Sequence, residues 1–125
     1  MPRQFLAFVF VLGGSFALVN CGGTVCSFQS LNISPTTASI SVGTSQQFLA
    51  FGNSGPMGCA AAASNLSTVT WSVSDAVNTT LSNTNGTATV TCVGHTSTSV
   101  TVTATLSSAQ NHGHTITGAA SLTCN

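Results

Sequence analysis

The side chains of this 125-residue chain that could do chemistry are few, and cysteine and histidine dominate them. The whole sequence holds one acidic residue, Asp75, and one basic residue, Arg3, beside three histidines and five cysteines. A single carboxyl group cannot form the acid and base pair of general catalysis. A chain almost without Lys and Arg also offers no basic surface for nucleic acid. The composition therefore predicts a protein that is not an enzyme and does not bind nucleic acid.

The chemistry to consider for the histidines is metal binding. The pattern His112-Gly113-His114 could chelate a transition metal, but a zinc hydrolase needs three protein ligands. We expect His95 to lie at the other end of the domain, and Asp75 to stabilise a turn. We therefore interpret the histidines as exposed loop residues and predict no metal, no cofactor and no catalytic residue.

The five cysteines are Cys21, Cys26, Cys59, Cys92 and Cys124. An odd number of cysteines in an exported protein needs an explanation. No Cys-x-x-Cys pair is present, which disfavours a zinc site. Four of the cysteines could form two disulfides, which fits an oxidising compartment, and four cysteines allow three pairings.

The N-terminal residues have the composition of an export signal. Arg3 precedes fifteen uncharged residues, 5–19. A membrane-spanning helix needs roughly twenty apolar residues, so this shorter run is typical of a secretory signal peptide.

The sequence LVNC at 18–21 resembles the lipobox of bacterial lipoproteins, which ends in an acylated cysteine. The resemblance implies that residues 1–20 are removed, that Cys21 carries lipid, and that four cysteines remain for disulfides. It also implies export to the cell envelope, either anchored in an outer membrane or extracellular. Asn20 departs from the small residue usual at its position, and cleavage after Ala17 is the alternative.

Residues 21–29 are predicted to be a short tether, and residues 30–125 a single domain. The part from Cys21 onward contains 17 Ser and 20 Thr, many alternating with apolar residues as in strands with one buried face. Pro35 is expected to split the first strand at a sheet edge. The predicted strand segments are 31–34 with 38–42, 46–51, 69–73, 77–82, 87–93, 99–106 and 116–124. This pattern predicts an all-β, antiparallel sandwich of about seven strands.

The segments ISPTTASISVGTSQQFLA, VTWSVSD, GTATVTCVG and TSVTVTATL occur in this order. Together they resemble a bacterial immunoglobulin-like domain of group 2 over residues 31–123. The resemblance implies an immunoglobulin-like sandwich. The long segment 52–68 and the four cysteines after Cys21 depart from the family pattern.

In such a sandwich, the first strand would start at the same end as the loop that holds Cys59. Segments 87–93 and 116–124 would finish at the opposite end with their cysteines facing inward. We therefore favour the pairings Cys26–Cys59 and Cys92–Cys124. Trp71 falls on the inward phase of its strand, and we predict that it is a central core residue.

The expected function is that of a non-enzymatic, surface-anchored structural or adhesive module. It would be held to a lipid membrane through acylated Cys21 and would contact a protein or glycan surface. The alternative is a carbohydrate-binding sandwich of the cell envelope, which would need exposed aromatic platforms. The chain offers one Trp and no Tyr for that purpose.

Overall fold

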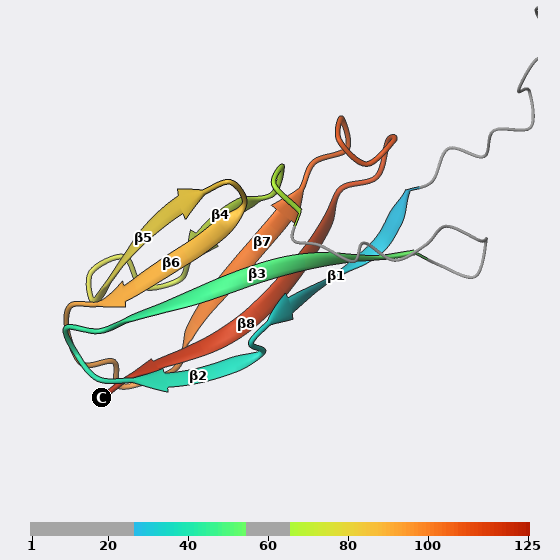
Figure 1. The fold of residues 1–125 in the computed structure, drawn as a ribbon. Helices are drawn as coiled ribbons and strands as arrows, with labels where there is room; N and C mark the ends of the chain where they lie inside the picture. The colour runs from blue at the N-terminus through green and yellow to red at the C-terminus, as the bar shows by residue number, and fades with distance from the viewer. Residues whose placement is uncertain (1–26, 55–65) are drawn as a thin grey trace, which may run out of the picture.

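Alternating apolar and polar residues form eight β-strands within residues 27–54 and 66–125, the parts of the chain that this computed structural model describes (Figure 1). The strands form two four-stranded sheets, with the orders β1-β3-β6-β5 and β2-β8-β7-β4. Their bounds are β1 Phe28–Ser34, β2 Thr37–Ile40, β3 Ser45–Ser54, β4 Thr70–Val73, β5 Thr79–Thr84, β6 Thr87–Cys92, β7 Val100–Leu106 and β8 Ile116–Cys124. The predicted all-β sandwich is confirmed.

The strand order matches that of a constant-type immunoglobulin sandwich. One sheet of that architecture has the order A-B-E-D and the other holds C, F and G. With β1 as A, β3 as B and β4 to β8 as C to G, the two sheets correspond, and β2 is an additional strand beside G. The described residues therefore contain eight strands rather than about seven, because the first strand contributes two.

Pro35 divides the first strand, as predicted, and the two halves join different sheets. Proline has no N–H to donate to a ladder, and the Ser34–Pro35 peptide bond is cis. Beyond it the chain leaves β3 and joins β8, where the Ser121 N–H donates to the Thr36 carbonyl oxygen at 2.9 Å. Because β1 lies at the edge of one sheet and β2 at the edge of the other, this crossing covers one side of the sandwich.

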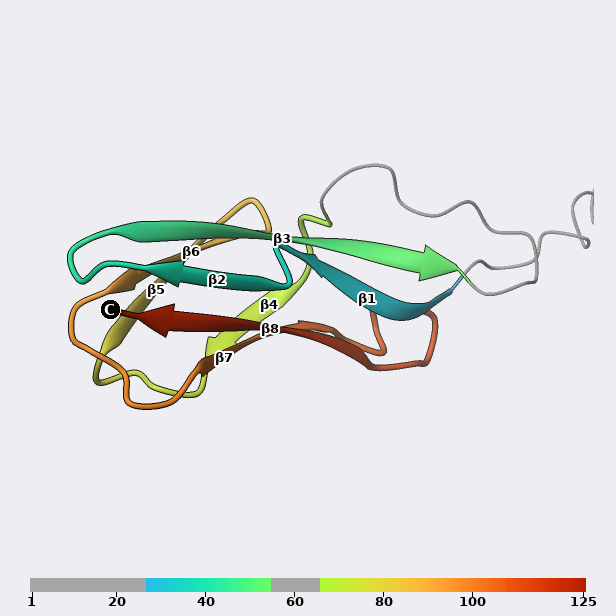
Figure 2. The same cartoon turned by 90° about the horizontal axis from the view of Figure 1, so that it is seen from below.

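The pairing of β2 with β8 is the one parallel pair among the described strands, in a sandwich that is otherwise antiparallel as predicted. These strands run parallel, from Thr37 opposite Ser121 to Ile40 opposite Cys124. Figure 2 shows both arrows pointing the same way. The reason is that β2 continues in the direction of β1 and meets a strand of the other sheet that already runs in that direction. All other strand pairs are antiparallel.

The strand expected at 77–82 lies two residues later, at Thr79–Thr84. The carboxylate of Asp75 accepts hydrogen bonds from the N–H groups of Val77 and Asn78, each at 3.0 Å, and holds both in a turn. The strand then continues until Asn85-Gly86, whose φ angles of 50° and 77° suit a tight hairpin turn.

The core lies between the two sheets and consists of the apolar phase of each strand. Phe48 is the largest fully buried side chain, with Leu106 and Leu122 next in size. The sheets approach closely at Gly118, where a Cβ atom would lie 2.7 Å from the carbonyl oxygen of Leu31. The absence of a side chain at Gly118 therefore lets β1 pack directly on β8.

Asn111, in the loop between β7 and β8, fastens the start of β1. Its side chain is 1% exposed. Its Oδ1 accepts a hydrogen bond from the Phe28 N–H at 2.7 Å, and its Nδ2 donates to the carbonyl oxygens of Phe28 and His114 at 2.8 and 2.9 Å. The amide thus pairs with Phe28 as a neighbouring strand would.

Asn111→Ala is expected to lower the free energy of unfolding by about 1–3 kcal/mol, because it removes three hydrogen bonds and leaves partly buried backbone groups unsatisfied. Urea unfolding followed by Trp71 fluorescence would measure the loss. Ala109→Ser, in the same loop and exposed, is the control and should change stability by less than about 0.5 kcal/mol. Equal stability of the two variants would contradict the role of Asn111.

Candidate functional site

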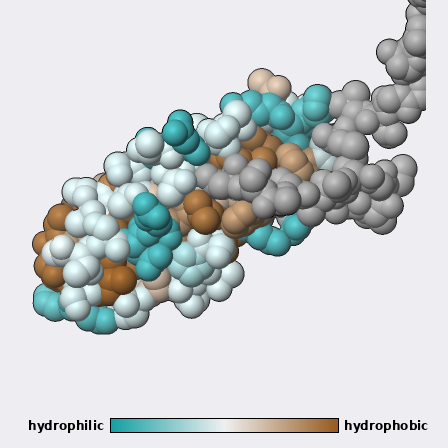
Figure 3. Space-filling view, in the orientation of Figure 1, coloured by the Kyte–Doolittle hydropathy of each residue, from teal (hydrophilic) through white to brown (hydrophobic). Residues whose placement is uncertain are grey.

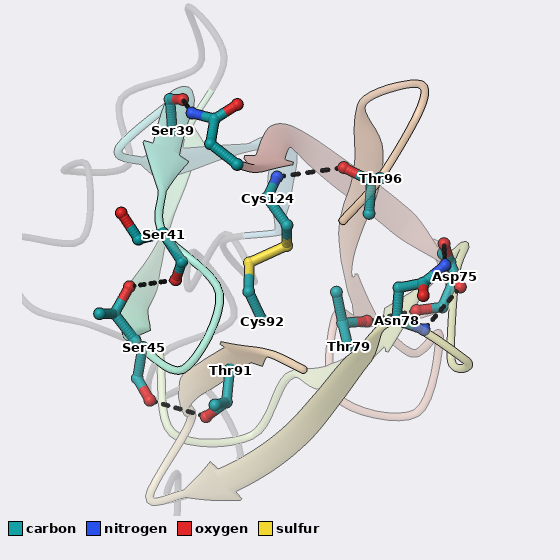
Figure 4. The surroundings of a disulfide bond; sticks show 12 residues. Ser39, Ser41, Ser45, Asp75, Asn78, Thr79, Thr91, Cys92, Thr96 and Cys124 are labelled. Atoms are coloured by element: carbon teal, nitrogen blue, oxygen red, sulfur yellow. Dashed lines mark hydrogen bonds between the residues drawn. A yellow bond between two sulfur atoms is a disulfide. The ribbon is translucent and has the colours of Figure 1, made fainter. Parts of the chain in front are cut away.

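The end of the sandwich where β6 and β8 finish is closed by a disulfide between Cys92 and Cys124 (Figure 4). The two Cα atoms are 5.6 Å apart, and the residues are 32 positions apart in sequence. Cys92 belongs to one sheet and Cys124 to the other, and both are buried. This predicted pairing is confirmed, and the bond joins the two sheets covalently.

Hydrogen bonds of the Cys92 and Cys124 backbone connect the surrounding loops to the disulfide. The Gly43 N–H donates to the carbonyl oxygen of Cys92 at 2.7 Å, and the Cys92 N–H donates to that of Thr44 at 3.0 Å. On the other sheet, the Cys124 N–H donates to the Thr96 hydroxyl at 3.0 Å (Figure 4). The turn after β2, the loop after β6 and the end of β8 thus form one connected surface.

Asp75 organises the third loop at this end, between β4 and β5. Besides the two N–H groups named above, its carboxylate accepts a hydrogen bond from the Asn78 side chain at 2.8 Å. The hydroxyl of Thr79 donates to the Asp75 carbonyl oxygen. The side-chain hydrogen bond from Asn78 is the largest cause that lowers the pKa of Asp75 below its usual value of 3.8, followed by the Asn78 N–H. The expected turn role of Asp75 is confirmed.

Trp71 lies half-buried on β4 and packs against the core, in which Phe48 is the largest fully buried side chain. Its indole N–H donates to the Gly86 carbonyl oxygen at 2.9 Å. Because β4 and the β5–β6 turn belong to different sheets, this bond connects them at the side opposite β1 and β2. The indole is engaged within the fold rather than presented as a platform.

The opposite end of the sandwich holds a pocket of about 330 Å³, within the size range of small-molecule sites. Its lining residues are Ser27, Phe28, Gln29, His114, Thr115 and Ile116. His112 and His114 are exposed in the β7–β8 loop, whereas His95 is exposed in the loop after β6. Within residues 27–54 and 66–125, no three side chains of His, Cys, Asp or Glu are grouped to hold a metal.

The remaining predicted sites, Cys21, Cys26 and Cys59, lie outside the described residues. Phe28 and Ser54, at the margins of the described part, are opposite each other in the β1–β3 ladder. Nowhere in the described ranges is there a helix that is long and apolar enough to cross a membrane.

The sequence analysis did not identify the residues that distinguish the two ends of the sandwich. These are the buried Asn111 at one end and three exposed valines at the other. Asn111 gave no signal because a polar residue in a turn-rich segment resembles any loop asparagine. Val42, Val77 and Val93 are 38%, 84% and 51% exposed. Alternation places Val93 outside, because it follows an inward-facing cysteine. Val42 and Val77 are exposed because β2 ends before Val42 and β5 begins after Val77.

Neither a protein-family model nor a curated protein sequence matches this chain. The topology and the disulfide are therefore the observations on which a functional interpretation rests. Together they define a cross-linked β-sandwich, and the disulfide is characteristic of an oxidising, extracytoplasmic compartment.

Replacing both Cys92 and Cys124 with Ala is expected to lower the free energy of unfolding by about 3.5–4 kcal/mol, since the bond limits the entropy of the unfolded chain. Urea unfolding would measure the difference. A reductant should shift the wild-type midpoint towards that of the variant. A loss below about 1 kcal/mol would mean that the cross-link does not govern stability.

Asp75 is expected to make the free energy of unfolding depend on pH in the acidic range. Its folded pKa is depressed, so its contribution is present above the unfolded value of 3.8 and is lost as the pH falls through the lower folded value. Asp75→Asn should therefore flatten the fall in the urea midpoint below about pH 4. The terminal carboxyl group remains in both proteins and serves as the internal control. An unchanged pH profile in the variant would rule out this linkage.

Proposed function

We propose that the protein is an exported, non-enzymatic immunoglobulin-like module of bacterial group 2, anchored by lipid on Cys21, with a structural or adhesive role. The observation that carries the proposal is the immunoglobulin-type strand order closed by a buried disulfide between the sheets. A disulfide-linked sandwich suits a protein that must stay folded outside the cell, where it cannot rely on intracellular chaperones.

Export is supported by two independent features. Disulfides such as Cys92–Cys124 persist in oxidising compartments. The N-terminal sequence combines a basic residue, a short apolar run and the lipobox-like LVNC. The group 2 assignment is supported by the sequence segments already described and by the half-buried Trp71 on the third strand of the A-to-G order. The cysteines connect strands E and G, unlike the B–F bridge of antibody domains.

The outer surface supports a binding role towards uncharged partners. Hydroxyl groups lie in register across the sheets, as in the exposed row Thr37, Ser121 and Thr101. Each hydroxyl can both donate and accept hydrogen bonds. Because the described residues carry one acidic side chain and no Lys or Arg, such contacts would depend little on ionic strength.

The arrangement of the two ends supports anchoring at one end and presentation of the other. β1 starts beside the β7–β8 loop, where Asn111 holds Phe28. The chain ends at the opposite end of the sandwich, beside the disulfide (Figure 1). A tether that leads into β1 would place the disulfide end farthest from the membrane.

Intact-mass measurement of the exported protein tests this proposal. We expect the mass of residues 21–125 plus acyl chains, less four thiol hydrogens for two disulfides. Cys21→Ser should remove the acyl mass and release the protein from the membrane fraction. Cells that make this variant should attach to surfaces as poorly as cells without the protein. A full-length intracellular product with free thiols would overturn the proposal.

A further inference from the structure

The hairpin turn between β5 and β6 consists of Asn85 and Gly86 (Figure 1). The last pair of the β5–β6 ladder is Thr84 opposite Thr87, so only these two residues form the turn. Their φ angles of 50° and 77° are both in the left-handed region, which favours Asn followed by Gly. A Cβ atom at residue 86 would also collide with the backbone of Leu66. The turn therefore favours asparagine at residue 85 and requires glycine at residue 86.

An asparagine that precedes glycine has an intramolecular reaction open to it. The backbone nitrogen of the glycine attacks the side-chain carbonyl carbon of the asparagine, and the new C–N bond closes a succinimide ring. The bond from that carbon to the side-chain nitrogen breaks, and ammonia leaves with the proton of the glycine N–H. Water then adds to either of two carbonyl carbons and opens the ring, which gives aspartate or isoaspartate. Glycine favours ring closure because it has no Cβ atom to crowd the attacking nitrogen.

Asn85 differs from the other described asparagines in its neighbour and its environment. It precedes the glycine of the one Asn-Gly sequence in the chain, and it is exposed to water. Asn111 is 1% exposed and its amide bonds to the backbone of Phe28, and the amide of Asn78 bonds to Asp75. The other described asparagines that a residue follows are Asn32, Asn53 and Asn83, which precede Ile, Ser and Thr. Sequence and exposure therefore both favour the reaction at residue 85.

We propose that Asn85 is a site of spontaneous modification to aspartate and isoaspartate, and that isoaspartate releases Trp71 from the turn. The indole N–H of Trp71 donates to the Gly86 carbonyl oxygen at 2.9 Å. In isoaspartate the main chain runs through the side-chain carbon, which adds one methylene group to the backbone directly before Gly86. A turn closed between Thr84 and Thr87 must move Gly86 to accommodate this longer backbone. The indole then loses its hydrogen-bond acceptor, and β4 loses a link to the β5–β6 turn.

Either product also adds a carboxylate to a surface that has almost no charge. The described residues hold one acidic side chain, Asp75, and no Lys or Arg. In Figure 3 most of the described surface is pale, the colour of hydropathy values between the two extremes. The modification therefore doubles the number of acidic side chains in the described part of the chain. Because the reaction needs only water, the modified fraction grows with the age of the molecule and depends on neither lipidation nor export.

Ageing the purified, folded protein in warm, mildly alkaline buffer tests the site. Mass spectrometry of chymotryptic peptides follows the replacement of each amide by an acid, and enzymatic methylation quantifies isoaspartate. Asn85 is expected to convert at least about tenfold faster than Asn83, which corresponds to a barrier lower by about 1.4 kcal/mol. Asn83 is the internal control, because it is exposed in the same hairpin and precedes a β-branched residue. Equal conversion at the two positions, or conversion of Asn85 only in urea-unfolded protein, would overturn the proposal.

Two variants separate the added charge from the longer backbone. Trp71 is the one tryptophan of the chain, so the fluorescence of the protein reports on its indole. Wild-type emission is expected to shift to longer wavelength in proportion to isoaspartate. Freshly purified Asn85→Asp, which has the charge on a normal backbone, should emit as unaged wild type does. Asn85→Gly suits the positive φ and cannot form the ring, so its emission should stay constant during ageing.

Circular dichroism verifies that both variants are folded. Wild-type emission that stays constant while isoaspartate accumulates would overturn the release of Trp71. An equal shift in fresh Asn85→Asp would also overturn it, because the charge alone would then be the cause. An equal shift in aged Asn85→Gly would show that the change arises elsewhere in the chain, which would likewise overturn it.

Discussion

Two separate sheets can remain face to face only if their inner surfaces are largely apolar and their edges and ends are held. The inner surfaces meet this requirement through alternation, which puts residues such as Phe48 and Leu122 into the core. One side is covered where the first strand changes sheets after Pro35, and the other is linked by the indole of Trp71. The rest of the structure depends on this separation of core and surface.

The two ends of the sandwich are held by different chemistry. At one end, the amide of Asn111 bonds the backbone of Phe28 as a second neighbouring strand would. At the other end, a covalent bond joins Cys92 and Cys124, and backbone hydrogen bonds connect the loops around it. β1 begins at the hydrogen-bonded end, and the exposed Val42, Val77 and Val93 lie at the cross-linked end. This asymmetry is compatible with the proposed module, which would be attached at one end and make contacts at the other.

The surface differs from that of most soluble domains because it is polar without being charged. Ser and Thr supply its hydrogen-bonding groups, and the one acidic side chain serves a turn. Long-range electrostatic attraction would therefore contribute little to any association, and recognition would depend on shape, hydroxyl groups and apolar contacts. This property favours partners that are themselves uncharged, in keeping with the proposed adhesive role.

Period-two alternation predicted most of the strands and their buried faces, and the missing N–H of proline predicted the break at Pro35, because each depends on local sequence. The Cys92–Cys124 pair followed from the inward phase of both residues at the same end of the predicted sandwich. The parallel β2–β8 pairing, the late start of β5 and the burial of Asn111 could not be predicted in this way. Each depends on contacts between segments far apart in the chain, or on where a turn ends. The exposure of Val42 and Val77 likewise followed only from the structure, because β2 ends before Val42 and β5 begins after Val77.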